Sequence, residues 1–261
     1  MIDPSVWDLT VAAALILAAG IVSLVLRLDL ERRLAVASVR TIVQLLLVGY
    51  VLRWVFDLDR WTLVVAVIGV MVLVAAFAAV GRSSRTFTGA TSRALVVLVA
   101  SGLTTTLMVT QVVLGVEPWY RPQYLIPLLG MVLGNGLTGV SLVLDQVLER
   151  LATQRALIEM ELSLGATRWE AARDHLAAAV RRGMIPVINT MMVVGVVSLP
   201  GMMTGQILAG SDPLVAVKYQ IVVMFMIAAS TSLGCMLMAL AVYRRMFNAR
   251  HQLDVDRIRP R

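Results

Sequence analysis

Residues 146–183 read QVLERLATQRALIEMELSLGATRWEAARDHLAAAVRRG and form the one long polar passage in an otherwise apolar chain. They carry eleven formal charges, yet apolar residues recur at helical spacing on both sides of Gly165, at Leu151, Ile158 and Leu162 and then at Trp169, Ala172, Leu176 and Val180. Gly165 suits a helix C-terminus, and Thr167 with Glu170 forms a capping box. The pattern predicts a helix, a turn and a second helix on a membrane surface. The helix pair either docks on a partner protein or is a helical hairpin that has no partner.

The composition is that of an integral membrane protein. Of the 261 residues, 59% are hydrophobic, and the mean hydropathy is +0.85. Aromatic residues make up 6% and no window shows the alternation of an outer-membrane barrel, so the spans are expected to be helices. The single cysteine, Cys235, excludes an internal disulfide and a CxxC site.

Seven stretches are close to the roughly 20 residues that a membrane-spanning helix requires. The expected spans are residues 6–26, 36–56, 61–80, 94–116, 124–148, 184–209 and 213–243. The fold class is therefore all-α, a polytopic transmembrane bundle.

The basic residues orient this bundle. Nineteen of the 23 lie in or flank the connections after the first, third and fifth spans or lie in a polar tail at residues 244–261. The positive-inside rule then puts the N-terminus outside and the C-terminus in the cytoplasm, and we expect contact with lipid. The charge of +7 sets orientation instead of forming a patch that would bind nucleic acid. The tail after Arg250 is charged and is expected to be frayed.

Catalytic motifs do not emerge from the sequence. It contains no HExxH or CxxC, and His175 and His251 both lie on polar segments. A Walker A loop requires a lysine after a Gly-rich turn, but the single lysine, Lys218, follows a valine. We therefore expect a protein that is not an enzyme, and a transporter of this kind would use an ion gradient or a separate ATPase.

Residues 159–180, EMELSLGATRWEAARDHLAAAV, resemble the cytoplasmic EAA loop of ABC-transporter permeases, the element that docks on the ATPase subunit. Glu159 precedes Gly165 by six residues, which is the spacing of that loop. The Leu-Pro that usually follows is Leu176-Ala177 in this chain, and a proline comes later, at Pro186. The resemblance assigns ATPase coupling to seven residues: Glu159, Glu161, Gly165, Ala166, Thr167, Trp169 and Glu170.

Four longer stretches are similar to the FetB-type iron-export permeases and to the related plant aluminium-tolerance permeases. They are SVRTIVQLLLVGYVL (38–52), IPLLGMVLGNGLTGVSL (126–142), INTMMVVGVVSLPGMMTGQILAG (188–210) and DPLVAVKYQIVVMF (212–225).

The resemblance implies one permease domain over residues 1–261 of a bacterial inner-membrane protein. It would pair with a second copy of itself and with an ABC ATPase subunit that holds ATP and Mg, while this chain binds no cofactor. The implied function is iron export or metal tolerance. An ion-coupled secondary transporter and an ABC subunit that transmits force without transport remain alternatives, and another metal, a metal chelate or a nucleotide sugar remain alternative substrates.

Two sets of polar residues within the spans are candidates for the substrate pathway. Arg40 and Gln44 share a helix face and either line the cytoplasmic half of a path or, for Arg40, extend to the interface. Asn135 stands beside Gly130 and Gly134, whose spacing permits close helix contact, so its amide binds substrate or hydrogen-bonds across a helix pair.

The sixth span supplies further candidates for the pathway. Asn189, Met202 and Met203 lie in it, and the methionines either act as soft ligands or fill the core. Pro200-Gly201 predicts a helix break, because a straight helix of 26 residues would be longer than a bilayer is thick. Beyond the break, Thr204, Gly205 and Gln206 are expected to expose carbonyl oxygens beside a cavity, and such oxygens suit iron(II).

Overall fold

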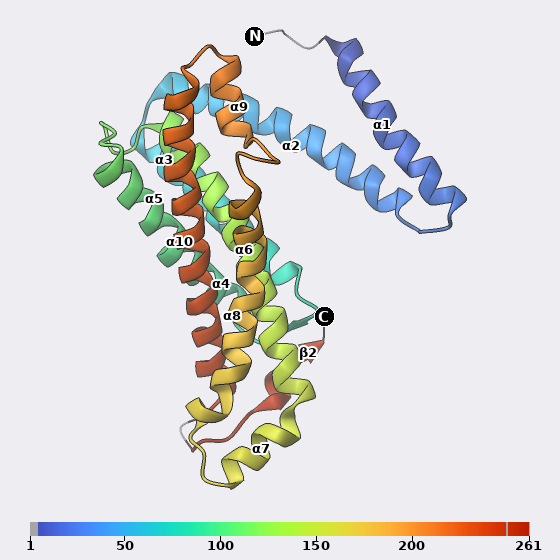
Figure 1. Cartoon of the computed structure of the whole chain (residues 1–261), viewed down its shortest axis with the longest axis vertical. Coiled ribbons are helices and arrows are strands. Elements are labelled where there is room, and N and C mark those ends of the chain that lie inside the picture. The colour runs from blue at the N-terminus through green and yellow to red at the C-terminus, as the bar shows by residue number, and fades with distance from the viewer. Residues whose placement is uncertain (1–4, 249, 261) are drawn as a thin grey trace. The chain divides into compact units, whose positions relative to one another are not determined.

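The structure is a computed structural model that describes residues 5–248 and 250–260, and it is helical almost throughout (Figure 1). It divides into two compact units, Met1–Arg60 and Trp61–Arg261. Within the described residues, six helical segments are long and apolar enough to cross a membrane. The expected all-α membrane architecture is therefore confirmed.

The first unit is a pair of apolar helices, α1 (Val6–Val25) and α2 (Glu31–Leu58). Side chains hold the turn between them: the Ser23 hydroxyl donates to the Glu31 carboxylate at 2.8 Å and accepts the Leu30 N–H at 3.1 Å. Glu31 lies in the first turn of α2, where a negative charge is favourable. The two helices therefore form a hairpin whose turn is held by side-chain hydrogen bonds.

The second unit is a bundle of long helices around α6 (Figure 1). α6 packs against α3, α8 and α10. The elements of this unit are α3 (Trp61–Gly81), β1 (Arg85–Thr86), α4 (Ala90–Leu98), η1 (Val99–Leu103), α5 (Thr104–Met108), η2 (Val109–Val113), α6 (Pro122–Thr153), α7 (Arg155–Ser163), α8 (Arg168–Val193), α9 (Gly201–Leu208), α10 (Pro213–Met246), η3 (Val255–Arg257) and β2 (Arg259–Pro260). α7 lies at one end of the bundle and α9 at the other (Figure 1).

The fourth span alternates between α and π geometry, since η1 and η2 are π-helical turns. Hydroxyl groups occupy this region: Ser101 and Thr106 are buried and donate to backbone carbonyls four residues earlier, each at 2.8 Å. A π turn leaves the backbone less regular than an α turn, so these side-chain bonds satisfy local carbonyl oxygens.

The expected break in the sixth span is present. α8 ends at Val193, and Pro200 is the residue that caps α9. Between them the chain turns at Gly195, whose φ of +84° favours glycine. The span is therefore divided into α8, which begins far inside the polar passage, and the short α9.

Glycines allow α6, α8 and α10 to approach closely. A Cβ atom built on Gly183 of α8 would lie 3.0 Å from the Gly139 carbonyl oxygen of α6 and 3.0 Å from the Cys235 sulfur of α10. The spacing of Gly130 and Gly134 also permits a close contact, but within the described chain a Cβ at Gly134 would meet nothing within 4 Å and one at Gly130 would meet only a methionine side chain, at 3.4 Å.

Candidate functional site

The turn between α7 and α8 has the geometry that its sequence predicts. The Gly165 N–H donates to the Leu162 carbonyl at 3.2 Å, and the Ala166 N–H donates to the Glu161 carbonyl at 3.1 Å. This pair of bonds is a Schellman motif, which requires a left-handed residue after the helix. Gly165 meets the requirement with a φ of +96°, so it is the conformational pivot of the turn.

α8 begins with the capping box that was expected from the spacing of Thr167 and Glu170. The Glu170 carboxylate accepts the Thr167 N–H at 2.7 Å, and the Thr167 hydroxyl accepts the Glu170 N–H at 3.3 Å. The bond from the Thr167 N–H, together with a second from its hydroxyl, lowers the pKa of Glu170 below its ordinary value. The charged Glu170 carboxylate therefore caps the exposed N-terminus of α8.

The two other acidic candidates, Glu159 and Glu161, lie in α7. Glu159 pairs with Arg155 at 2.7 Å along one helix face, and this hydrogen bond raises the pKa of Arg155. Both side chains of the pair are about half exposed, with relative areas of 52% for Arg155 and 45% for Glu159. The pair is therefore available at the surface, where water and salt screen its contribution to stability.

The apolar stripes of the passage face the bundle. Ile158 of α7 is fully buried, as are Leu151 at the end of α6 and Ala172 of α8. Trp169, which was a candidate anchor for a partner, packs edge-on against Tyr243 of α10 with ring centroids 5.4 Å apart and stays 48% exposed. The helix pair is thus fixed on its inner side while its turn and one face of Trp169 remain open.

The C-terminal residues contact this site, contrary to the expectation that they would be frayed. The Arg168 backbone N–H donates to His251 Nδ1 at 3.0 Å, and the Arg168 guanidinium donates to the Asn248 carbonyl at 3.1 Å. An open hollow of about 690 Å³ separates α7 from the C-terminal residues, and Arg155 and Glu159 line it. The tail therefore holds the start of α8 but leaves α7 free on that side.

His175 lies about two turns beyond Arg168 in α8, and its surroundings predict a pH dependence of stability. Its side chain is 7% exposed, and its Nδ1 atom is buried without a hydrogen-bond partner among the described residues. Burial, and then the positive charge of Arg150, lowers the pKa of His175. His175 therefore binds a proton more readily in the unfolded chain than in the native chain. The free energy of unfolding falls as the pH drops below the ordinary histidine pKa of about 6.5.

We expect the melting temperature of the purified protein in detergent to be lower at about pH 5.5 than at about pH 7.5. In the variant His175→Gln this part of the dependence should disappear, and thermal unfolding followed by tryptophan fluorescence would measure it. An identical pH dependence in the variant would assign the titration to another group.

The pathway candidates belong to both units of the chain. Arg40 and Gln44 are exposed on α2 in the first unit, where Arg40 borders a hollow of about 490 Å³ with Arg32 and Arg33. Asn135 of α6 is exposed, and its amide donates to the carbonyl of Met131 at 2.9 Å within the same helix. The described contacts of Asn135 are therefore local to α6.

The remaining candidates lie on α8 and α9. Asn189 is exposed on α8. Met202 packs against the buried cluster of Leu128, Val132, Val187, Val223, Met226 and Ile227, as core filling would require, and Met203 is half-buried beside it in the chain. The Gln206 Oε1 atom is buried and has no hydrogen-bond partner among the described residues.

The expected free carbonyl oxygens after the break are not found. The Gly205 carbonyl accepts the Ala209 N–H at 3.0 Å, and the Gln206 carbonyl accepts the Ser211 N–H at 3.0 Å. Thr204 donates its hydroxyl to the Pro200 carbonyl at 3.1 Å. The reason is that the chain resumes a helix directly after Pro200. Among the described residues of α9, the buried polar side-chain atom without a hydrogen-bond partner is Gln206 Oε1.

Sequence reasoning missed a polar network where α3, α6 and α8 meet. Asp145 of α6 accepts the Ser84 N–H and the Ser84 hydroxyl, each at 2.7 Å. Arg82 donates to Thr138 of α6 at 3.2 Å, and Arg182 of α8 donates to Gln146. Asp145 was visible in the sequence as a lone carboxylate inside an apolar run, and such a residue usually has a polar partner.

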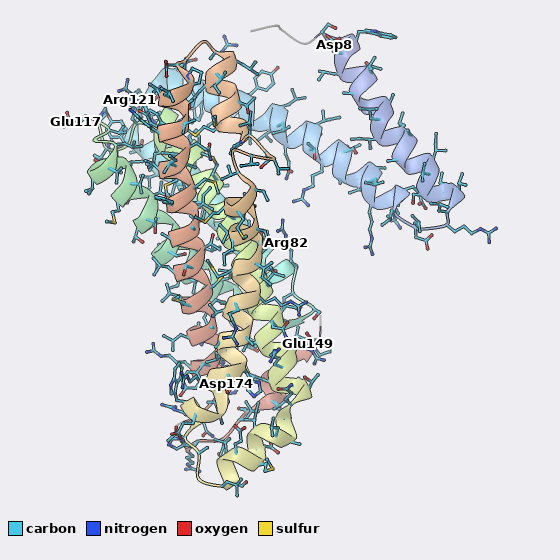
Figure 2. The ribbon with its side chains drawn as sticks, in the orientation of Figure 1. Asp8, Arg82, Glu117, Arg121, Glu149 and Asp174 are labelled. Atoms are coloured by element: carbon cyan, nitrogen blue, oxygen red, sulfur yellow. The ribbon has the colours of Figure 1, made fainter. Side chains whose placement is uncertain are left out.

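Charged residues mark the two ends of the second unit. Figure 2 shows Glu117 and Arg121 at one end, with Glu149 and Asp174 toward the end where α7 lies and Arg82 between them. No group of three or more His, Cys, Asp or Glu side chains is placed to hold a metal ion in the part of the chain that the structure describes. The most developed arrangement of exposed polar groups is therefore the α7–α8 turn with the tail beside it.

Comparisons with known proteins cover nearly the whole chain. The model of the Uncharacterised protein family (UPF0014) matches residues 6–247. The chain is 42% identical over 231 residues to the UPF0014 membrane protein slr1647 of Synechocystis sp., with 87% of this chain and 88% of the relative covered. It is 33% identical over 252 residues to the Probable iron export permease protein FetB of Escherichia coli, with 97% and 96% covered.

A plant relative matches over a similar length. The chain is 31% identical over 243 residues to the Protein ALUMINUM SENSITIVE 3 of Arabidopsis thaliana, with 93% of this chain and 88% of the relative covered. No solved structure matches the chain. The bacterial relatives fit the expected inner-membrane location, and the apolar helices fit a multi-pass protein. The chain belongs to the UPF0014 family of membrane proteins.

Proposed function

We propose that this chain is the membrane permease subunit of an ABC-type exporter that moves iron out of the cytoplasm. A relative named as a probable iron export permease, 33% identical over nearly the full length of both chains, supports the substrate and the direction. The observation that carries the ABC assignment is the α7–α8 turn. It combines a Schellman motif, a capping box and a half-exposed Trp169 at one end of the bundle.

The energy source in this proposal is a separate ATPase subunit. This chain has no lysine in a phosphate-binding loop, so ATP and Mg would be held by that subunit, and the permease would act as two copies with two ATPases. The α7–α8 turn would then lie in the cytoplasm with the C-terminus, in agreement with the positive-inside rule.

α8 supplies a direct path for movement from the turn into the membrane. It is continuous from Arg168 to Val193, a length of about 39 Å at the usual helical rise. A shift of the turn toward the ATPase would therefore reach the break before α9. The pathway residues to test are Asn135 on α6, Asn189 on α8, and Thr204 and Gln206 on α9, with Met202 and Met203 also on α9.

Iron flux in inside-out membrane vesicles tests this function. In vesicles from bacteria that make the chain together with its ATPase subunit, we expect radioactive iron(II) to accumulate inside when ATP is added. Vesicles without the chain, and vesicles given a non-hydrolysable ATP analogue, serve as controls. Ionophores that collapse proton and sodium gradients should leave the flux unchanged.

Each other outcome contradicts a stated part of the proposal. Flux that needs an ion gradient and no ATP would identify a secondary transporter. ATP hydrolysis that depends on the chain but moves no iron would identify a force-transmitting subunit or a different substrate, and the same vesicles with manganese(II), zinc(II) or an iron chelate would separate these two.

A further inference from the structure

The C-terminal residues 247–260, which we call the C-terminal strap, connect two distant parts of the second unit. At its start the strap holds the first residue of α8. The Arg168 backbone and guanidinium bond to His251 and Asn248, as described above, and the guanidinium also lies 5.8 Å from the centre of the Tyr243 ring. Three separate contacts therefore converge on Arg168, next to the α7–α8 turn.

The strap is internally tied along its described length. Its first part is a closed loop: the Asn248 N–H donates to the Gln252 carbonyl at 3.1 Å, and the Asn248 Oδ1 atom accepts the Gln252 N–H at 3.0 Å. Its second part is held to the end of α10, where the Asp254 N–H donates to the Met246 carbonyl at 2.8 Å. These bonds tie Asn248 to Gln252 and Asp254 to the end of α10.

Arg257 extends these ties toward the far end. Its guanidinium pairs with Asp254 at 2.5 Å and also donates to the Arg245 carbonyl of α10 at 3.1 Å. One side chain thus fixes the path of the strap between α10 and β2.

The far end of the strap pairs with the connection between α3 and α4. β2 lies antiparallel to β1, with Arg85 opposite Pro260 and Thr86 opposite Arg259. The same connection is fastened to α6, because Asp145 accepts the two bonds from Ser84. A displacement that reaches β2 would therefore act on the connection to α3 and α4 and, through Ser84, on α6.

We propose that the C-terminal strap is a second transmission path, which carries movement of the α7–α8 turn to the α3–α4 connection while α8 carries it into the sixth span. This proposal rests on the proposed function. Chains of hydrogen bonds and salt bridges can carry coupling between distant sites, and the strap supplies such a chain of contacts. The open hollow between α7 and the strap means that α7 can tilt against an ATPase without breaking this chain of contacts.

Severing the far end tests the proposal. A protein truncated after Arg257 lacks β2 but keeps Asn248, His251 and the salt bridge to Asp254. In the vesicle assay we expect ATP hydrolysis to persist while iron moved per ATP falls by roughly 2- to 30-fold, the range for residues along a coupling path. His251→Ala, which removes one of the two bonds between Arg168 and the strap, should act in the same direction.

The matched control is Arg259→Ala. It removes a positive charge from the same strand but leaves the backbone pairing with Thr86, so iron moved per ATP should stay at the wild-type value. A covalent tie provides a second check: the pair Thr86→Cys and Arg259→Cys stands opposite in the strand register. In a protein that also carries Arg257→Ala, which removes the bonds from Arg257 to Asp254 and to α10, the oxidised cysteine pair should keep iron moved per ATP at the wild-type value.

The outcomes separate the two proposals. If the wild-type protein shows no ATP-driven iron flux, the proposed function fails, and the strap loses the role that depends on it. If wild-type flux is present and truncation leaves iron moved per ATP unchanged, the strap proposal alone is overturned. A parallel loss of hydrolysis, flux and folded protein in the truncated chain would also overturn it, since the strap would then be a stabilising element.

Discussion

Valine in place of Gly165 is expected to abolish ATP-driven transport while the membrane bundle stays folded. At this position the φ angle is +96°, and an added Cβ would meet nothing within 4 Å, so the obstacle is backbone strain and not a clash. A β-branched residue held in this conformation costs roughly 1–3 kcal/mol. The turn would avoid this cost by giving up the Schellman bonds, which changes the angle at which α7 meets α8. Iron flux and ATP hydrolysis in inside-out vesicles measure the loss.

Two variants separate coupling from general strain. Gly210→Val introduces the same conflict at a φ of +91°, also in open space, but at the turn between α9 and α10. We expect it to retain far more ATP hydrolysis than Gly165→Val, because it lies outside the proposed docking surface. Asparagine tolerates left-handed geometry better than valine, so Gly165→Asn should recover part of the activity. Unchanged ATP-driven transport in Gly165→Val would remove the assignment of this turn to ATPase docking.

Gly183→Val is expected to cause the largest loss of stability. The first added carbon would lie 2.6 Å from the Val143 side chain and 3.0 Å from the Gly139 carbonyl oxygen. The carbonyl belongs to backbone and cannot rotate away, so α8 would have to move off α6. Overpacking of this kind costs roughly 1–3 kcal/mol and sometimes more. The melting temperature and the yield of monodisperse protein in detergent should both fall.

The matched control for this crossing is Gly134→Val on α6. Gly134 also lies in a helix, but an added carbon would meet nothing within 4 Å. Its melting temperature should therefore stay close to that of the wild type. Equal losses in Gly134→Val and Gly183→Val would show that valine at any helical glycine is harmful, and the packing explanation would fall.

The local structure of the candidate site was predictable from the sequence. Gly165, Thr167 and Glu170 form the turn and the cap that their spacing indicates, because these motifs involve bonds between residues at most five positions apart. The membrane-spanning helices were predictable for a similar reason: each must satisfy its own backbone hydrogen bonds and present about 20 apolar residues. The docking role of the turn and the direction of transport stay predictions.

One of the errors is local, and the others concern contacts between distant parts of the chain. The carbonyls after Pro200 were expected to be free, yet α9 forms immediately and uses them. The tail was expected to be frayed, yet His251 reaches Arg168 across 83 residues of sequence. Asp145 gave a signal as a lone carboxylate in an apolar run, but its partner Ser84 lies 61 residues away. No pattern of period two or 3.6 reports such pairings.

The glycines show most clearly which features follow from the sequence alone and which depend on the tertiary structure. By itself the sequence determined that this chain is a bundle of apolar helices with a polar helix pair turning at Gly165, because hydropathy and turn chemistry act within one element. Only the tertiary structure decided which glycines allow helices to touch. The spacing of Gly130 and Gly134 suits a contact, but Gly139 and Gly183 make it, since the facing surface comes from another helix and its position depends on the packing of the whole unit.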